Sequence, residues 1–475
     1  MGVERPASSN ELPVVSTALR RTLGLRTVVS TSAGLTFASS TFLVVVFIGF
    51  SLTGDASWLP IVIAGLLCAL AAASFSELNG MYPSASGIRL YIQRSFGETA
   101  AHVVSLTYMS VVSLVVGTEA YVLSYVLNAA FHAIPPPVWI FLMLTLATAA
   151  NFRGLKVAGA LQDIITYAVI ASILMLSICS LSKAHFHVPG LLHPGSIGTV
   201  ANMVGFAVFL FVGFEWVTPL AEEVKDVRAI PTGMFIALGI LVVAYSLIST
   251  AMFANPAYRG ALYGSAALRN PIPHLTFALL SLGIPGRIVM IVTSLCMSLT
   301  TFNAGLITVS RFLYASAREN ILPKQLEKVS VKYSTPYTAV FTVYAIALVV
   351  SFVVYFTKKY VILVNLAAVT ESIIYALAAS CVIALKIKEP KTARPYKMWG
   401  GYVLPAVTVL LFLGVGVGVI FTANDINYWG AGVLLALCAG GWWVYVQFFA
   451  MPKKERIKAE QAAKRQSRRP PKKLD

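Results

Sequence analysis

Long apolar runs recur along almost the whole of this 475-residue chain, and they restrict what it can fold into. Each run is about 20 residues long, the length that an α-helix needs to cross the roughly 30 Å hydrocarbon core of a bilayer. Charged residues make up 12% of the sequence, against about 25% in a soluble globular protein, so lipid is the predicted solvent. The sequence therefore predicts an all-α integral membrane protein with about twelve transmembrane helices. The predicted spans are 27–53, 58–82, 99–131, 136–152, 160–182, 198–221, 232–254, 272–316, 336–357, 360–386, 402–422 and 428–450.

The net charge of +17 is distributed unevenly between the two sides of the predicted membrane. If the N-terminus is cytoplasmic and the sides alternate, 30 of the 36 Lys and Arg residues lie on the cytoplasmic side. This asymmetry follows the positive-inside rule, so both termini are expected in the cytoplasm. The protein itself is expected in a plasma or inner membrane. The asymmetry also explains the basic charge without nucleic acid as a partner. The basic C-terminal tail is expected to be solvated, and contact with anionic lipid is open to it.

No insert between the apolar runs is long enough to bury a core of its own, so one membrane domain is expected. The sequence shows no phosphate loop and no catalytic triad string, and we expect neither a cofactor nor an enzymatic activity. The five cysteines all lie inside apolar runs, where they are expected to pack as small hydrophobic residues rather than bind metal or form disulfides: Cys68, Cys179, Cys296, Cys381 and Cys438. The sequence does not indicate the oligomeric state.

Two predicted spans, the first and the sixth, contain residues that interrupt a membrane helix. In the first, TSAGLTFASSTFLVVVF (31–47), small and hydroxyl-bearing residues cluster in the middle. In the sixth, FLFVGFEWVTPLAEEV (209–224) places Gly213, Glu215 and Pro219 close together. Interrupted helices at matching places in two halves are typical of inverted-repeat transporters, whose substrates bind where the half-helices meet. The alternative is that the small residues only allow close helix packing.

Five strings of the sequence, taken in order, resemble those of the amino acid–polyamine–organocation transporter family. The first is SFSELNGMYPSASGIRLYIQRSFG (74–97), which departs from the family at Ile88, where a second glycine is usual. The others are NFRGLKVAGALQDIIT (151–166), AEEVKDVRAIP (221–231), SRFLYASARENILP (310–323) and RPYK (394–397). Each string alone is moderately specific, but together they extend over most of the chain.

The resemblance implies the leucine-transporter fold, in which ten core helices form two inverted repeats of five. Two further, peripheral helices follow the repeats in this chain. Residues 1–26 would then be a cytoplasmic N-terminus, 27–182 the first repeat and 198–386 the second. Residues 402–450 would form the peripheral helices and 451–475 the basic cytoplasmic tail. The resemblance also implies transport by alternating access.

In that family, backbone N–H groups of a Gly-Ser-Gly string in the first broken helix receive a substrate carboxylate. The aligned residues here are Ala38, Ser39 and Ser40. Because Cβ atoms stand where the family has glycines, close approach to the backbone is harder. Either the carboxylate binds further out with help from the serine hydroxyls, or the substrate has no carboxylate. Thr36 and Thr41 flank this string and belong to the expected substrate site.

The resemblance places a substrate ammonium group at the backbone carbonyls of Phe211, Val212 and Gly213 in the sixth span. Phe209 is the predicted occluding gate, because an aromatic at this position closes over the substrate in arginine–agmatine antiporters and a cation–π contact would hold an amine. Glu215 follows the break, where the N-terminus of a restarting helix favours a carboxylate. Glu215 is expected either to take part in proton-linked gating or to serve as a structural N-cap, and the sequence favours neither role over the other.

Glu119 and Glu371 lie within the third and tenth spans and outside the family strings. An acid inside the membrane is costly and indicates function by default. Together with Glu215, these residues could form an anionic site for Arg, Lys, agmatine or putrescine. Alternatively, they carry protons or are satisfied by neighbouring hydroxyls. Glu119 is expected to lie nearer the substrate than Glu371.

The sequence leaves the coupling ion open. Many proton-coupled relatives carry a Lys in the fifth span, where this chain has Val169. In sodium-coupled relatives, hydroxyls of the eighth span help to bind the ion. Thr300 and Thr301 are available for this, with Asn303 nearby, although such hydroxyls also join membrane helices.

Two arginines of the eighth predicted helix are candidates for an inner gate. Arg311 and Arg318 lie seven residues apart on one helix face. We expect them to pair with Glu222 or Glu223 in the cytoplasmic loop.

The favoured interpretation is a secondary active transporter, a symporter or an exchanger, for amino acids or related cationic amines. A neutral amino-acid carrier, in which the acids serve protons, is the main alternative. A transporter-like sensor and a channel are less well supported, since the tail has no signalling domain and no polar filter string occurs.

Overall fold

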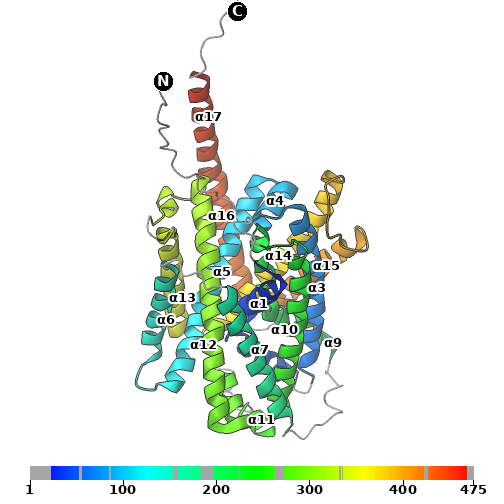
Figure 1. The fold of residues 1–475 in the computed structure, drawn as a ribbon, viewed down its shortest axis with the longest axis vertical. Helices are drawn as coiled ribbons and strands as arrows, with labels where there is room; N and C mark the ends of the chain where they lie inside the picture. The colour runs from blue at the N-terminus through cyan, green and yellow to red at the C-terminus, as the bar shows by residue number, and fades with distance from the viewer. Residues whose placement is uncertain are drawn as a thin grey trace, which may run out of the picture.

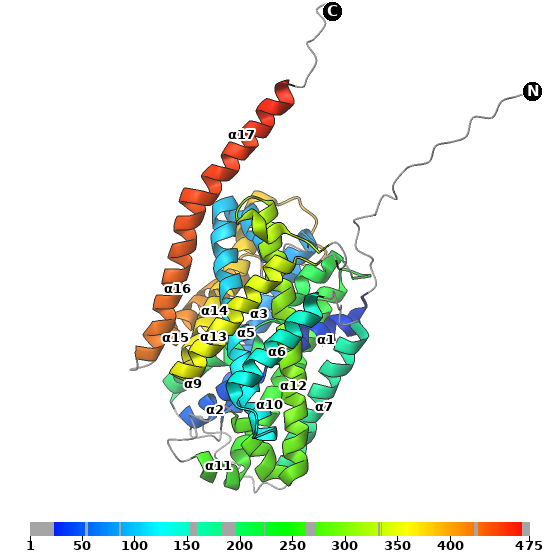
Figure 2. The same ribbon diagram turned by 90° about the vertical axis from the view of Figure 1, so that its left-hand side faces the viewer.

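The computed structural model describes residues 23–52, 56–84, 87–152, 159–182, 196–222, 224–262, 272–330, 333, 335–421 and 426–467. These residues form an elongated helical bundle, from which α17 projects at one end (Figures 1 and 2). Its longer helices are α3 (Trp58–Met81), α5 (Glu98–Ala130), α6 (Pro136–Phe152), α7 (Gly159–Leu181), α10 (Ala229–Ala254), α12 (Pro273–Arg318), α13 (Tyr337–Thr357), α14 (Tyr360–Lys388), α15 (Val403–Phe421), α16 (Ile426–Tyr445) and α17 (Met451–Ser467). The shorter ones are α1 (Leu25–Thr36), α2 (Thr41–Ser51), α4 (Ile88–Phe96), α9 (Ile197–Val208), η1 (Phe209–Phe211), η2 (Phe214–Glu222), α11 (Pro256–Leu262), η4 (Lys324–Glu327) and η5 (Val446–Ala450).

The helices coincide with the predicted spans, because backbone in lipid must satisfy its own hydrogen bonds. In the described part of the chain, 10 helices are long and apolar enough to cross a membrane, and α1 with α2 makes up to 11 if the bent pair is one span. α6, with 17 residues, is a shorter apolar helix and corresponds to the predicted span at 136–152. The predicted all-α membrane fold is confirmed.

The predicted eighth span, 272–316, was too long for one crossing, and the backbone shows how it divides. Gly283 interrupts α12 with a φ of 68°, and Pro285 follows two residues later. A positive φ is readily available only to glycine, and proline cannot continue the hydrogen bonding of the preceding turn. The chain before Gly283 therefore forms a separate short helix, and the remainder of α12 crosses the bundle.

The first half-helix lies inside the bundle. α1 packs against α7, α10, η2 and α12 and is seen nearly end-on in the middle of Figure 1. Its N-terminal end is tied to two other segments. Leu23 pairs with Val224 in a parallel bridge, and the Asp163 carboxylate of α7 accepts a hydrogen bond from Ser30 and lies 3.5 Å from Arg26.

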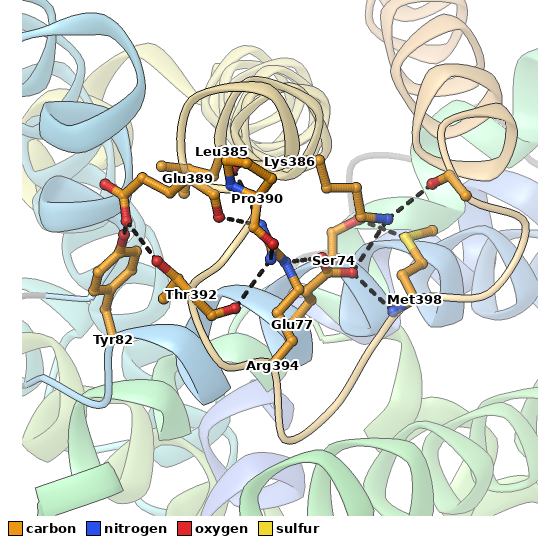
Figure 3. Close-up of polar contacts among 11 residues, drawn as sticks. Ser74, Glu77, Tyr82, Leu385, Lys386, Glu389, Pro390, Thr392, Arg394 and Met398 are labelled. Atoms are coloured by element: carbon orange, nitrogen blue, oxygen red, sulfur yellow. Dashed lines mark hydrogen bonds and ion pairs between the residues drawn. The ribbon is translucent and has the colours of Figure 1, made fainter.

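A buried ion-pair cluster joins the end of α3 to the chain after α14 (Figure 3). The carboxylate of Glu77 is fully buried. Its Oε1 lies 3.0 Å from Nε of Arg394, and its Oε2 lies 3.4 Å from Nζ of Lys386. The backbone N–H of Met398 donates to Oε2 at 2.8 Å. Two of the family strings, at 74–97 and 394–397, therefore meet in this cluster.

Arg394 also holds the loop that follows α14. Its guanidinium donates to the backbone carbonyls of Leu385, Glu389, Pro390 and Thr392. Because these bonds and the ion pair with Glu77 come from one side chain, Arg394 fixes the loop on the end of α3.

We expect Arg394→Ala to lower the stability of the folded protein strongly. Removing one partner of a buried ion pair costs about 3–5 kcal/mol, because the remaining charge keeps its desolvation penalty. The measurement is the unfolding temperature of the purified protein in detergent.

The matched control is Arg456→Ala, which removes an ion pair with Glu460 whose side chains are 82% and 59% exposed. Exposed pairs of this kind are worth about 0.3–0.5 kcal/mol. Equal unfolding temperatures for the two variants would show that the Glu77 cluster does not hold the fold together.

Candidate functional site

The first break of the bundle separates α1 from α2 by a bend of 63°. Phe37 leaves the helix with an extended conformation, at a ψ of 115°. The chain re-enters helix through a turn in which the Thr41 N–H donates to the Ala38 carbonyl at 3.1 Å and the Thr41 hydroxyl donates to the same carbonyl at 2.6 Å. All five predicted residues of this segment, Thr36, Ala38, Ser39, Ser40 and Thr41, are buried.

The second break separates η1 from η2 and lies against the first. Val212 is extended, with a ψ of 126°, and Gly213 has a φ of 105°. A Cβ at Gly213 would lie 3.1 Å from the Leu35 carbonyl oxygen of α1, so only glycine suits both the conformation and the contact. The Ser32 hydroxyl donates to the Phe214 carbonyl at 2.7 Å. The two interrupted helices therefore meet inside the bundle.

The carboxylate of Glu119, on α5, binds backbone N–H groups at the start of α2. Its Oε1 accepts the Ser39 N–H at 2.8 Å, and its Oε2 accepts the Ser40 N–H at 3.0 Å. The Ser298 hydroxyl of α12 donates to Oε1 as well. The Ser39 hydroxyl donates to the Ser294 carbonyl at 3.1 Å. Glu119 is fully buried, so its carboxylate joins three helices away from solvent.

This arrangement has a direct electrostatic cause. The first N–H groups of a helix have no partner within the helix and carry partial positive charge, which favours an anion. At α2 that anion belongs to the protein itself. The family resemblance implies a substrate carboxylate near this string, or a substrate without one, and the structure places a side-chain carboxylate at the string itself.

Glu215 lies in the first turn of η2, as predicted, among aromatic hydroxyls. Tyr108 of α5 donates to its Oε1 at 2.8 Å, and Tyr375 of α14 donates to its Oε2 at 3.0 Å. The indole N–H of Trp216 donates in turn to the Tyr108 hydroxyl at 2.6 Å. Glu215 is thus a buried hydrogen-bond acceptor that joins three helices.

Glu371 of α14 belongs to the same cluster. It is buried one helical turn before Tyr375, the α14 tyrosine that donates to Glu215. Its Oε2 has no hydrogen-bond partner among the described residues. Two buried carboxyl groups in electrostatic contact disfavour double ionisation, so this pair is a natural place to hold a proton.

The predicted aromatic gate and its neighbours are packed in the interior. Phe209 and Phe211 are buried in η1, whereas Val212 is partly exposed. The Phe211 ring lies edge-on to Tyr245 at 6.3 Å, and Tyr245 also contacts Phe37 beside the first break, at 5.5 Å. These rings connect the two breaks through apolar contact.

The hydroxyls considered for an ion site connect α12 to the first break. Thr300 donates to the Gly34 carbonyl at 3.2 Å, and Thr301 donates to the Phe37 carbonyl at 3.1 Å. Asn303, also on α12, is partly exposed. Both hydroxyls also lie near the Met297 carbonyl of their own helix, at 2.7 Å for Thr300 and 3.1 Å for Thr301, so the single proton of each is shared between α12 and the first break.

The predicted inner gate is placed only in part. Glu223 lies outside the described residues, as does the side chain of Glu222. Arg311 and Arg318 are exposed, and the Arg318 guanidinium lies 5.7 Å from the centre of the Tyr314 ring. Their pairing with the loop stays a prediction.

A different ion-pair network lies at the end of the bundle where α17 projects. Glu319, after α12, contacts Arg89 at 2.6 Å and Lys454 of α17 at 3.8 Å. Lys454 also pairs with Glu98, and His102 lies beside both acids. Burial raises the pKa of Glu319, but the hydrogen bond and the charge of Arg89, with Lys454, lower it overall. Because cations already neutralise the acids, we assign an ion-pair network here rather than a metal site.

Several partners of the predicted residues were missed by sequence reasoning. Ser298 holds Glu119, and the polar aromatic residues Tyr108, Trp216 and Tyr375 surround Glu215. A tyrosine or serine in an apolar span can be present for packing alone. It indicates a partner of a buried acid only if it lies on the helix face that points to that acid. Which face that is depends on the packing of helices far apart in sequence.

Comparison with known proteins agrees with this geometry. The sequence profile of the family described as "Amino acid permease" matches residues 28–464. "Large neutral amino acids transporter small subunit 2" of Mus musculus is 27% identical over 364 residues, which cover 71% of this chain and 65% of that transporter. "Branched-chain amino acid permease BcaP" of Bacillus subtilis (strain 168) is 24% identical over 84% of this chain and 89% of its own length. The "Methylthioribose transporter" of the same bacterium is 24% identical over 86% of this chain and 94% of its own length.

The chain spans somewhat less than two thirds of the mouse relative but most of the two bacterial ones. The family match extends over nearly the whole sequence and confirms the resemblance to amino acid–polyamine–organocation transporters. The chain is therefore a member of the amino acid permease family, with the multi-pass membrane architecture that its apolar helices indicate.

Proposed function

We propose that the protein is a secondary active carrier for amino acids or related cationic amines and works by alternating access. The observation that carries this proposal is the contact between the two interrupted helices, α1–α2 and η1–η2, inside the bundle. Interrupted membrane helices expose backbone groups that can bind a polar solute, and broken backbone at membrane depth is tolerated only where protein or a solute surrounds it. The solute would bind between these breaks, with α5, α12 and α14 around it.

The charge of the interior supports a cationic amine. Glu119, Glu215 and Glu371 are all buried near the breaks. Among the described Lys and Arg residues, Lys386 is the buried one, and it pairs with Glu77 in the cluster of Figure 3. Acids inside a membrane protein attract a cation or a proton, since an unbalanced charge there is costly.

A neutral amino-acid carrier is the second candidate. The mouse relative is named for large neutral amino acids and one bacterial relative for branched-chain amino acids. Another bacterial relative is named for methylthioribose rather than for an amino acid, so the names leave the solute class open. In the neutral carrier, the three acids would carry protons or hold helices.

We infer that protons, rather than sodium, couple transport. The Thr300 and Thr301 hydroxyls lie within hydrogen-bonding distance of the Gly34 and Phe37 carbonyls, and so crowd the carbonyls that a sodium ion would use. Glu215 and Glu371 are buried acids that can hold a proton. They would have to do so without the fifth-span lysine of many proton-coupled relatives, since Val169 is buried at that place on α7. The two inverted repeats, the cytoplasmic position of both termini and the plasma or inner membrane are part of the same proposal, as is an inner gate involving Arg311 and Arg318.

The test of the proposed function is uptake into proteoliposomes from a panel of labelled Arg, Lys, putrescine, Ala and Leu, with and without an inward proton gradient. We expect accumulation of the cationic solutes against their gradient. Accumulation of Ala or Leu alone would instead establish the neutral carrier. Absence of flux for all five, in protein that remains folded, would contradict a carrier for amino acids or amines.

Replacing external sodium by choline is expected to leave uptake unchanged, whereas a protonophore is expected to reduce accumulation about tenfold or more. The physical reason is that the threonine hydroxyls occupy the α1 carbonyls while the acid pair remains available for a proton. The measurement is initial and steady-state uptake of the best solute of the panel. Loss of uptake without sodium would exclude proton coupling as the main driving force.

Glu215→Gln is expected to abolish accumulation driven by a proton gradient but to preserve counterflow exchange of the same solute. Glutamine keeps the shape, and its carbonyl oxygen can accept from one tyrosine while its NH2 group donates to the hydroxyl oxygen of the other, but it cannot exchange a proton. Glu455→Gln, at an exposed position on α17, is the matched control. If Glu215→Gln accumulates solute as well as this control does, the acid is a structural cap.

A further inference from the structure

We propose that the transported solute has no free carboxylate, because the protein's own Glu119 fills the place where a solute carboxylate would bind. The inference rests on the proposed function and narrows its solute to amines without an acid group. It starts from the hydrogen bonds of Glu119 to Ser39 and Ser40 at the N-terminus of α2.

The donors at the start of α2 are all in use. The N–H groups of Ser39 and Ser40 donate to the two oxygens of Glu119. The next three, of Thr41, Phe42 and Leu43, donate to the carbonyls of Ala38, Ser39 and Ser40 at 3.1, 3.3 and 3.1 Å. From Ser39 to Leu43, five consecutive N–H groups are therefore unavailable to a second carboxylate at the N-terminus of α2.

Expelling Glu119 from this position would be costly. The side chain is fully buried, and no Lys or Arg of the described chain forms an ion pair with it. Its compensation comes from the two N–H groups, the Ser298 hydroxyl and the partial positive charge of the helix terminus. A solute carboxylate that took over these donors would leave Glu119 buried without compensation, close to another negative charge.

Two hydroxyls beside Glu119 remain available for a different kind of group. Ser40 Oγ and Ser294 Oγ are buried and have no hydrogen-bond partner among the described residues. Both residues belong to the same cluster, since the Ser40 N–H binds Glu119 and the Ser294 carbonyl accepts the Ser39 hydroxyl. A hydroxyl oxygen accepts hydrogen bonds from an ammonium group, which donates three. An ammonium group can therefore use these oxygens and the negative charge of Glu119 together.

The chemistry of the site thus fits a protonated mono- or diamine. Such a solute brings positive charge to an interior that holds three buried acids, and it makes no demand on the donors of α2. An α-amino acid would bring the same ammonium group but also a carboxylate, for which the N-terminus of α2 has no N–H donor left between Ser39 and Leu43.

The test compares solutes that differ only in the carboxylate. Agmatine is paired with arginine, cadaverine with lysine and putrescine with ornithine. Each competes for counterflow of the best labelled amine in proteoliposomes that contain the wild-type protein. We expect each amine to compete at a concentration at least about tenfold lower than its amino acid.

The outcomes separate this inference from the proposed function. If arginine, lysine and ornithine compete as well as the amines, or better, the inference is overturned while a cationic carrier stands. If only neutral amino acids are transported, the proposed cationic carrier and the inference both fall.

Glu119→Gln provides a second, independent readout. The change removes the charge at nearly constant volume and frees part of the donor set of α2, so the preference for agmatine over arginine is expected to fall about tenfold. Glu455→Gln is the control, and size-exclusion chromatography of both variants checks the fold. A folded Glu119→Gln protein that keeps the wild-type preference would overturn the inference. If the variant does not fold, the paired solutes on the wild-type protein still decide it.

Discussion

The hydrogen bonds between the Glu119 carboxylate and the N-terminus of α2 are the interaction on which the centre of this membrane protein depends. A helix that stops in the middle of a membrane exposes N–H groups, and no water is present there to bind them. Glu119 satisfies two of these groups, and they satisfy Glu119. Ser298 adds a bond from α12, so the break in the first span fixes the relative positions of α2, α5 and α12. Neither the break nor the buried acid is stable by itself in this environment.

The buried acids Glu77, Glu119 and Glu215 are stabilised in three different ways. The kind of partner distinguishes an acid that holds the fold from one that is available to a solute or a proton. Glu77 faces Arg394 and Lys386, so its charge is cancelled and the cluster holds the end of α3 (Figure 3). Glu119 is bonded to backbone N–H groups and Glu215 to tyrosine hydroxyls, which compensate for lost hydration but carry no full positive charge. An acid with a cationic partner strengthens a fold, whereas acids without one make the interior receptive to a proton or a cationic solute.

Length and hydropathy were sufficient to predict the spans, because every crossing obeys the same thickness of hydrocarbon. The second break was predictable too, since Gly213, with a φ of 105°, stands in an otherwise apolar helix. What joins the elements was not predictable. Glu119 binds residues 80 and 79 positions earlier, and Glu77 binds Arg394 across 317 positions. Both Glu77 and the RPYK string were recognised as features of a family, but a single sequence does not state that two such features meet. Whether they meet depends on which face of each helix carries them, and that depends on how the helices pack.

A carboxylate tethered to the protein changes the electrostatics of a transport cycle. When a solute supplies the anion at a helix N-terminus, the charge arrives and leaves with the solute. Glu119 stays with α5, so the site keeps its negative charge after the solute has gone. Under the proposed function, the empty carrier must then reorient with a negative charge inside the membrane that hydrogen bonds stabilise but no cation balances, which is costly. A second amine or a proton on the acids removes that cost. The tethered carboxylate therefore favours a carrier that returns loaded, by exchange of one amine for another or by carrying a proton on the Glu215–Glu371 pair.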